Sequence, residues 1–136
     1  MIVIDASVWV SYVIVADVHH VATTIWMERE LAGPEDMSAP ALILAEVAGA
    51  VARQTGRPAF ASRSVQELQA MPRFTLVGMD SRLADEAQEL AARLRLRSAD
   101  AFYVAAALSL DAALFSWDEE QVNRGGAVVA TGKPSL

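Results

Sequence analysis

The sequence contains no cysteine and almost no lysine. The lack of thiols excludes disulfides, catalysis by a thiolate, and zinc or iron–sulfur sites built from cysteine. Lys133 is the single lysine beside ten arginines, and the formal net charge is −6, so the chain lacks a general basic surface for nucleic acid. A phosphate substrate is still compatible with this charge, because divalent cations bound at an acidic cluster invert the local sign.

Long apolar segments are also missing, although 54% of the residues are hydrophobic. The uncharged run 6–16 is interrupted by Ser7 and Ser11 and is too short to span a membrane. No basic leader precedes Asp5, which lies where a signal peptide would have its apolar core. We therefore expect a single domain over residues 1–136 that is cytoplasmic and not associated with a membrane.

Apolar patterns predict strands that alternate with helices. The predicted strands cover 2–4, 74–77, 113–116 and 127–131. The predicted helices cover 18–31, 40–55, 59–71, 81–94, 99–110 and 118–123. Pro40 is expected in the first turn of its helix, Asp80 or Ser81 as one N-cap and Ser98 as another. The alternation predicts an α/β domain with a largely parallel sheet sandwiched between helices.

Two familiar kinds of site do not fit the spacing. His19 and His20 are adjacent, so on a helix their side chains diverge by about 100° and cannot act as an acid–base pair; we expect both at the surface. The segment 131–134 lacks the upstream glycine and the following hydroxyl of a phosphate-binding loop.

Two carboxylates lie in nearly apolar helices. Glu46 is the only polar side chain in the run 40–52, and a helix that is apolar on every side should be buried, so Glu46 needs a charge partner, a raised pKa or a metal. A position at the helix rim with an arginine partner is the alternative. Asp100 is the only acid in the apolar run 99–108, where a favourable interaction with the helix dipole would also explain it.

Two further carboxylates directly follow strands. Asp5 and Asp118 each precede residues that can begin a helix, so each is also an ordinary N-cap. Ligands of parallel sheets bind beyond the carboxyl ends of the strands, where both acids should emerge. Together with Glu46 and Asp100 they form a set of hard oxygen ligands suited to Mg²⁺ or Mn²⁺. Such a site can activate water for hydrolysis of a phosphodiester bond.

Four motifs carry a family resemblance. They are Val3-Ile-Asp-Ala-Ser-Val8, Leu44-Ala-Glu-Val47, Ser98-Ala-Asp-Ala-Phe-Tyr-Val-Ala105 and Phe115-Ser-Trp-Asp118. In order and spacing the chain resembles the PIN-domain family, and most closely its VapC-type toxins. The resemblance implies a three-layer α/β/α sandwich with a five-stranded, mainly parallel sheet, and a Mg²⁺- or Mn²⁺-dependent endoribonuclease. It also implies the toxin role in a type II toxin–antitoxin system, with RNA as substrate, a cognate antitoxin protein and a homodimer.

The resemblance assigns roles residue by residue. Asp5, Glu46, Asp100 and Asp118 match the catalytic, metal-binding quartet. Ser7 and Ser116 match the supporting hydroxyls, and Ser116 would orient Asp118. Trp117 is bulkier than expected, and Glu119 could share the role of Asp118 as the fourth ligand.

Several alternatives stay open. The arginines at 93, 95 and 97 either guide the RNA backbone or simply end a solvated helix. The aromatic residues Trp9, Tyr12 and Trp26 either form a surface for a second copy or an antitoxin helix, or belong to the core. The rival functions are a PIN-fold module that only binds, and a receiver-type signalling domain, which would need a lysine near the acids.

Overall fold

The computed structural model describes residues 1–135, which form a five-stranded parallel sheet flanked by helices. The strands are β1 (Ile2–Ile4), β2 (Met37–Pro40), β3 (Phe74–Val77), β4 (Ala113–Phe115) and β5 (Thr131–Gly132). The helices are α1 (Ala6–Val13), α2 (His20–Ala32), α3 (Ile43–Thr55), α4 (Pro58–Ala70), α5 (Ser81–Leu94), α6 (Ser98–Ser109) and α7 (Glu119–Gly125). This architecture confirms the predicted α/β class and the parallel sheet.

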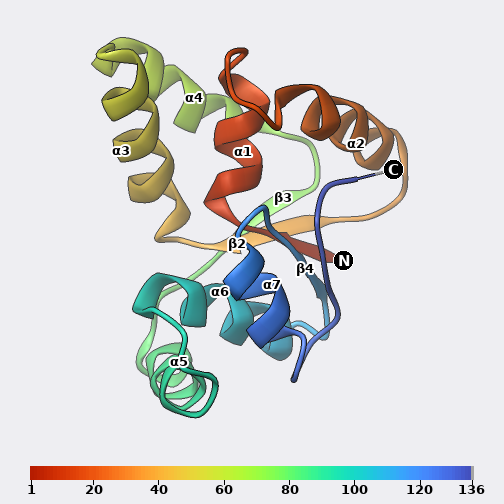
Figure 1. Cartoon of the computed structure of the whole chain (residues 1–136), viewed down its shortest axis with the longest axis vertical. Coiled ribbons are helices and arrows are strands. Elements are labelled where there is room, and N and C mark those ends of the chain that lie inside the picture. Colours follow the sequence, from red (N-terminus) through yellow and green to blue (C-terminus); the bar gives the residue numbers. More distant parts are fainter. Residues whose placement is uncertain (136) are drawn as a thin grey trace.

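The helices cover both faces of the sheet. Helices α1 to α4 lie on one side, and α5, α6 and α7 lie on the other (Figure 1). The strand order is β3-β2-β1-β4-β5, so the chain adds strands outward from β1 in one direction and then continues from β4 in the other. The carboxyl ends of β1 and β4 therefore meet at the point where the direction reverses, which is where ligands bind in open parallel sheets.

The helix predicted to begin at Pro40 begins later, because Pro40 is the last residue of a strand. β2 pairs with both of its neighbours, and Pro40 is opposite Val77 of β3. Proline has no N–H to donate to a neighbouring strand, so strands usually exclude it. It is tolerated here because it is the last residue of the strand. The strand was missed because its middle residues, Ser38 and Ala39, are small and not β-branched, which leaves little strand signal in the sequence.

The last predicted strand is also displaced. Residues 127–129 follow α7 in a turn, where Val128 and Val129 donate to the carbonyl of Gly125 at 3.0 and 3.1 Å. Their side chains pack against the core from outside the sheet. The strand itself is Thr131–Gly132, which pairs with Leu114 and Phe115 of β4, so a short apolar run packed beside the sheet was mistaken for a strand within it.

Two helix details differ from expectation. Helix α3 is buried along one side only, through Ile43, Val47 and Val51, while Ala45 is exposed; alanine is small enough to face water at little cost, so an apolar helix need not be enclosed. Ser98 is the first residue of α6 and not its cap, because Arg97 holds the N-cap position without a side-chain bond.

The exposure of the early aromatic residues decides whether they belong to the core or to a docking surface. Trp9 and Trp26 are 2% and 1% exposed and belong to the core, whereas Tyr12 is half-buried against it. The alternative in which the two tryptophans form a docking surface is therefore wrong. Within residues 1–135, no helix combines the length and apolarity needed to cross a membrane.

Candidate active site

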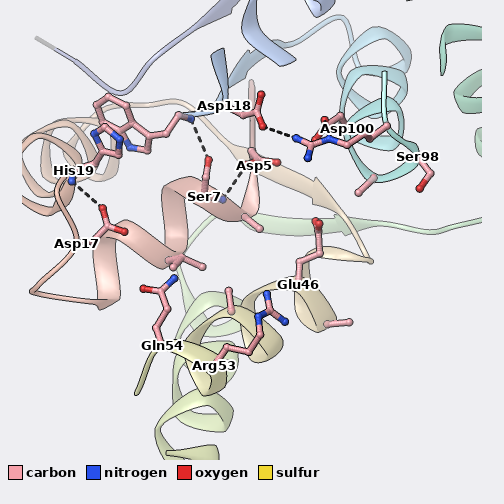
Figure 2. Close-up of a pocket in the computed structure, with 17 residues that line it drawn as sticks. Asp5, Ser7, Asp17, His19, Glu46, Arg53, Gln54, Ser98, Asp100 and Asp118 are labelled. Atoms are coloured by element: carbon pink, nitrogen blue, oxygen red, sulfur yellow. Dashed lines mark hydrogen bonds and ion pairs between the residues drawn. The ribbon is translucent and has the colours of Figure 1, made fainter. Parts of the chain in front are cut away.

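The four predicted carboxylates line one cavity at the carboxyl ends of the strands. The cavity has a volume of about 750 Å³ and is walled by the beginnings of α1 and α6, by one side of α3, by the segment between α1 and α2 and by the segment after β4. Asp5, Glu46, Asp100 and Asp118 all contribute to its lining (Figure 2). The fold thus brings together acids that are far apart in the sequence.

Asp5 lies deepest. It is the N-cap of α1, and its Oδ2 accepts a hydrogen bond from the Ser7 amide at 2.9 Å. The side chain is 8% exposed, and burial raises its pKa, while the hydrogen bond from Ser7 acts in the opposite direction. The predicted N-cap role and a place in the cavity therefore coexist in one residue.

Glu46 is held by a residue that sequence reasoning missed. The hydroxyl of Tyr103 donates to Glu46 Oε1 at 2.6 Å. Burial raises the pKa of Glu46, the Tyr103 hydrogen bond lowers it, and the charges of Asp5 and Asp100 raise it further. A phenol in an apolar helix needs a partner when buried, which was the available signal. The partner is thus a neutral donor and not the arginine of the alternative interpretation.

Asp100 and Asp118 share one arginine. Arg97 Nη2 lies 2.9 Å from Asp118 Oδ2, and its Nε lies 3.4 Å from Asp100 Oδ2. Burial and then the charges of Asp118 and Asp5 raise the pKa of Asp100, which Arg97 partly offsets. Asp118 is also the N-cap of α7 and accepts from the Gln121 amide at 2.9 Å.

The two predicted hydroxyls tie the first and last carboxylates together. Ser7 Oγ accepts from the Trp117 amide and Ser116 Oγ accepts from the Asp118 amide, both at 3.0 Å. The two hydroxyl oxygens lie 3.4 Å apart. Through these contacts the loop after β4 is fixed against the beginning of α1, so the positions of Asp5 and Asp118 are coupled.

Of the other charged residues considered from the sequence, some line the cavity and others lie away from it. Glu119 is exposed and pairs with Lys133 at 2.7 Å, which lowers its pKa, and within residues 1–135 neither residue lines the cavity. The lysine that a receiver-type site requires is thus elsewhere. Of the three arginines considered for RNA, only Arg97 lines the cavity, whereas Arg95 ends α5 in the left-handed conformation (φ 55°).

Two further residues beside the acids were not predicted. His19 was expected at the surface, but it lines the cavity and its ring stacks on Trp117. Gln121 is fully buried, lies near enough to Asp5 to lower its pKa, and both polar atoms of its amide lack a hydrogen-bond partner within the part of the chain described. No local sequence pattern indicated either contact.

The donor set fits a divalent cation in its chemistry. Carboxylate oxygens are the ligands that Mg²⁺ and Mn²⁺ prefer, and three of the four acids have raised pKa values, caused first by burial and, for Glu46 and Asp100, also by mutual repulsion. As they stand, no three acidic or histidine side chains within residues 1–135 converge closely enough to hold an ion. Arg97 instead bridges Asp100 and Asp118.

The family follows from the sequence as well as from the fold. The PIN domain model matches residues 2–126, so the chain belongs to the PIN domain family. A comparison with curated proteins finds no match for this sequence.

Solved structures share the fold at low sequence identity. VapC20 of Mycobacterium tuberculosis, described as a toxin that cleaves the sarcin–ricin loop, has a TM-score of 0.79 and 16% identity, with 92% of this chain and 95% of that chain covered. A toxin–antitoxin complex from Klebsiella pneumoniae has a TM-score of 0.72 and 14% identity, with full coverage of both chains. VapBC2 of Rickettsia felis, bound to a promoter DNA fragment, has a TM-score of 0.73 and 12% identity, with 98% of each chain covered. The fold is thus that of VapC toxins.

Proposed function

We propose that this protein is a metal-dependent endoribonuclease and the toxin of a type II toxin–antitoxin pair. The observation that carries the proposal is the convergence of Asp5, Glu46, Asp100 and Asp118 on one cavity at the reversal point of a PIN-family sheet. The structural relatives support the toxin role, since one is described as a toxin that cleaves the sarcin–ricin loop and another as a toxin–antitoxin complex.

In this proposal the four carboxylates divide the work. Asp5 and Asp100 would hold the main Mg²⁺ or Mn²⁺, and Glu46 and Asp118 would complete the set. Such a cation, when bound, would supply positive charge to activate water and to stabilise the leaving oxygen. Tyr103 holds Glu46 in place, and Ser7 and Ser116 fix the two loops that carry Asp5 and Asp118.

Arg97 has two roles in this mechanism, one in the free protein and one with RNA bound. It pairs with Asp100 and Asp118, and its side chain is 70% exposed, so it is free to move toward solvent. Guanidinium groups bind phosphate oxygens in a fork-like geometry. Arg97 therefore balances the acids in the free protein and contacts the RNA backbone once substrate enters.

The partners are part of the proposal. We expect a cognate antitoxin protein, a homodimer and a cytoplasmic site of action, where cellular RNA is available. Mass in solution with and without the small protein encoded by a neighbouring reading frame would test the first two expectations.

The deciding experiment is cleavage of a cellular RNA pool by the purified protein. The reactions contain Mg²⁺, Mn²⁺ or EDTA, and the Asp100→Asn variant is compared with Asp80→Asn, an equivalent change at the exposed N-cap of α5. Discrete fragments with the native protein and Asp80→Asn, absent with EDTA and Asp100→Asn, would support the proposal. Failure of the folded, antitoxin-free protein to cleave with either metal would favour a PIN fold that only binds.

A further inference from the structure

Two aromatic rings lie face to face in the wall of the cavity that holds the acids. The ring centroids of His19 and Trp117 are 3.9 Å apart, and the ring planes differ by 6°. Both residues are half-buried and line the same cavity as Asp5 and Asp118 (Figure 2). Because Trp117 directly precedes Asp118, the stacked pair has a fixed place beside the carboxylates.

Trp117 is held from two sides. Its indole Nε1 donates to Thr23 Oγ1 at 2.8 Å, and its backbone amide donates to Ser7 Oγ at 3.0 Å. Thr23 is itself bound to Ser11 at 2.7 Å inside the protein. Trp9 and Trp26, by contrast, are core residues with 2% and 1% exposure. Trp117 is thus a fixed support for the His19 ring stacked on it, so little conformational entropy is lost when a ligand stacks on the pair.

The carboxylates beside the pair favour an uncharged planar ligand there, since the arginines of the cavity, Arg53 and Arg97, belong to α3 and to the N-cap of α6. Asp17 also lines the cavity and accepts from the His19 backbone amide at 2.8 Å, so a carboxylate lies next to the rings and disfavours a second phosphate. The His19 ring takes part in no hydrogen bond or ion pair within residues 1–135, whereas the His20 ring is bound to the Ser11 carbonyl at 2.9 Å. Within the described residues, the His19 imidazole is therefore held by its stack on Trp117 and not by a hydrogen bond.

We propose that the His19–Trp117 pair is a stacking platform for one unpaired base of single-stranded RNA beside the carboxylates. This inference rests on the proposed function for the identity of the ligand, but it concerns binding and not the reaction. Aromatic side chains stack on unpaired bases with little dependence on base identity, and a base inside a duplex has no free face to offer. The platform would therefore select single-stranded segments and hold the nucleotide next to the phosphate that is cleaved.

The test measures binding without cleavage. Short single-stranded RNAs that carry a fluorescent label, each with an abasic nucleotide at one position, are titrated by fluorescence anisotropy in EDTA against protein with the Asp100→Asn change. In that background His19→Ala removes the imidazole stacked on Trp117, His19→Phe keeps a planar ring, and His20→Ala is the matched control at the neighbouring, unstacked histidine. Circular dichroism checks that every variant is folded.

The expected result is a loss in affinity of about tenfold at one abasic position, consistent with the usual strength of base–aromatic stacking. His19→Ala should abolish this discrimination, while His19→Phe and His20→Ala should retain it. Equal affinity for all abasic RNAs, no measurable RNA binding, or full discrimination by His19→Ala would each overturn the platform.

This experiment also separates the platform from the proposed enzyme activity. Discrimination that depends on His19 in a protein that never cleaves RNA would leave the platform standing and refute the nuclease. Metal-dependent cleavage by the native protein together with equal binding of intact and abasic RNAs would leave the nuclease standing and refute the platform.

Discussion

Replacing Asp5 by asparagine is expected to stabilise the metal-free protein and to abolish RNA cleavage. Asparagine is as good an N-cap as aspartate, so the 2.9 Å bond from the Ser7 amide has an acceptor in either case. What changes is the buried charge, whose burial raises the pKa of Asp5. We therefore expect Asp5→Asn to have the higher Tm at neutral pH; for a domain of this size each kcal/mol of added stability corresponds to about 3 to 5 °C in Tm.

The pH dependence of this gain follows from the direction of the pKa shift. An acid whose pKa is raised by folding lowers stability as pH rises from its unfolded pKa through its folded pKa, because the folded state binds more protons in that window. The Tm difference between Asp5→Asn and the native protein should therefore be largest at neutral pH, shrink as pH falls through the raised pKa, and vanish below the ordinary pKa of 3.8.

The assay is thermal unfolding in EDTA across pH, followed by RNA cleavage with Mn²⁺. Asp80→Asn provides the control, since it makes the same change at an exposed N-cap whose carboxylate accepts from the Leu83 amide at 2.9 Å; it should show neither the pH-dependent gain nor the loss of cleavage. The reasoning is refuted if Asp5→Asn is less stable than the native protein at neutral pH, or if it retains full activity.

Three further outcomes follow from the same cavity. Mn²⁺ should raise the Tm of the native protein at neutral pH, and EDTA should reverse the shift, because an ion that binds only the folded state stabilises it; an equal shift in Asp5→Asn would contradict this. Arg97→Gln removes the cation that bridges Asp100 and Asp118, so calorimetry should find Mn²⁺ bound several-fold more tightly, and unchanged or weaker binding would contradict the bridging role. Tyr103→Phe removes the donor that lowers the pKa of Glu46, so the acidic limb of the pH–rate profile should move to higher pH, and a shift to lower pH would contradict this.

The sequence indicated much of the site because its signals were local. Asp5 directly follows a β-branched strand and Asp118 lies shortly after another strand, and the carboxyl ends of parallel strands meet at one edge of the sheet. Glu46 stood out as the only polar side chain in the apolar run 40–52. These arguments required only the order of the elements, and the strand order β3-β2-β1-β4-β5 brought the acids together as expected.

The missed features depend on contacts between distant elements. Arg97 was one of three arginines with no local reason to differ, and only the approach of α6 to the loop after β4 joins it to Asp118. Tyr103 meets Glu46 across the space between α6 and α3. His19 and Trp117 stack because Thr23 anchors the indole to α2. Side-chain directions and helix packing decide such contacts, and neither is encoded in a single local pattern.

The division of the sheet between two halves of the chain has a practical consequence. The half before β3 contributes β1, β2, Asp5 and Glu46, and the half from β3 onward contributes β4, Asp100 and Asp118. The connection between them, at residues 71–73, exposes Pro72 and Arg73. Because β1 must insert between β2 and β4, neither fragment alone can display the four carboxylates. Under the proposed function, two separately produced fragments would be inactive until they reassemble, which would make this fold a starting point for a split reporter read out by RNA cleavage.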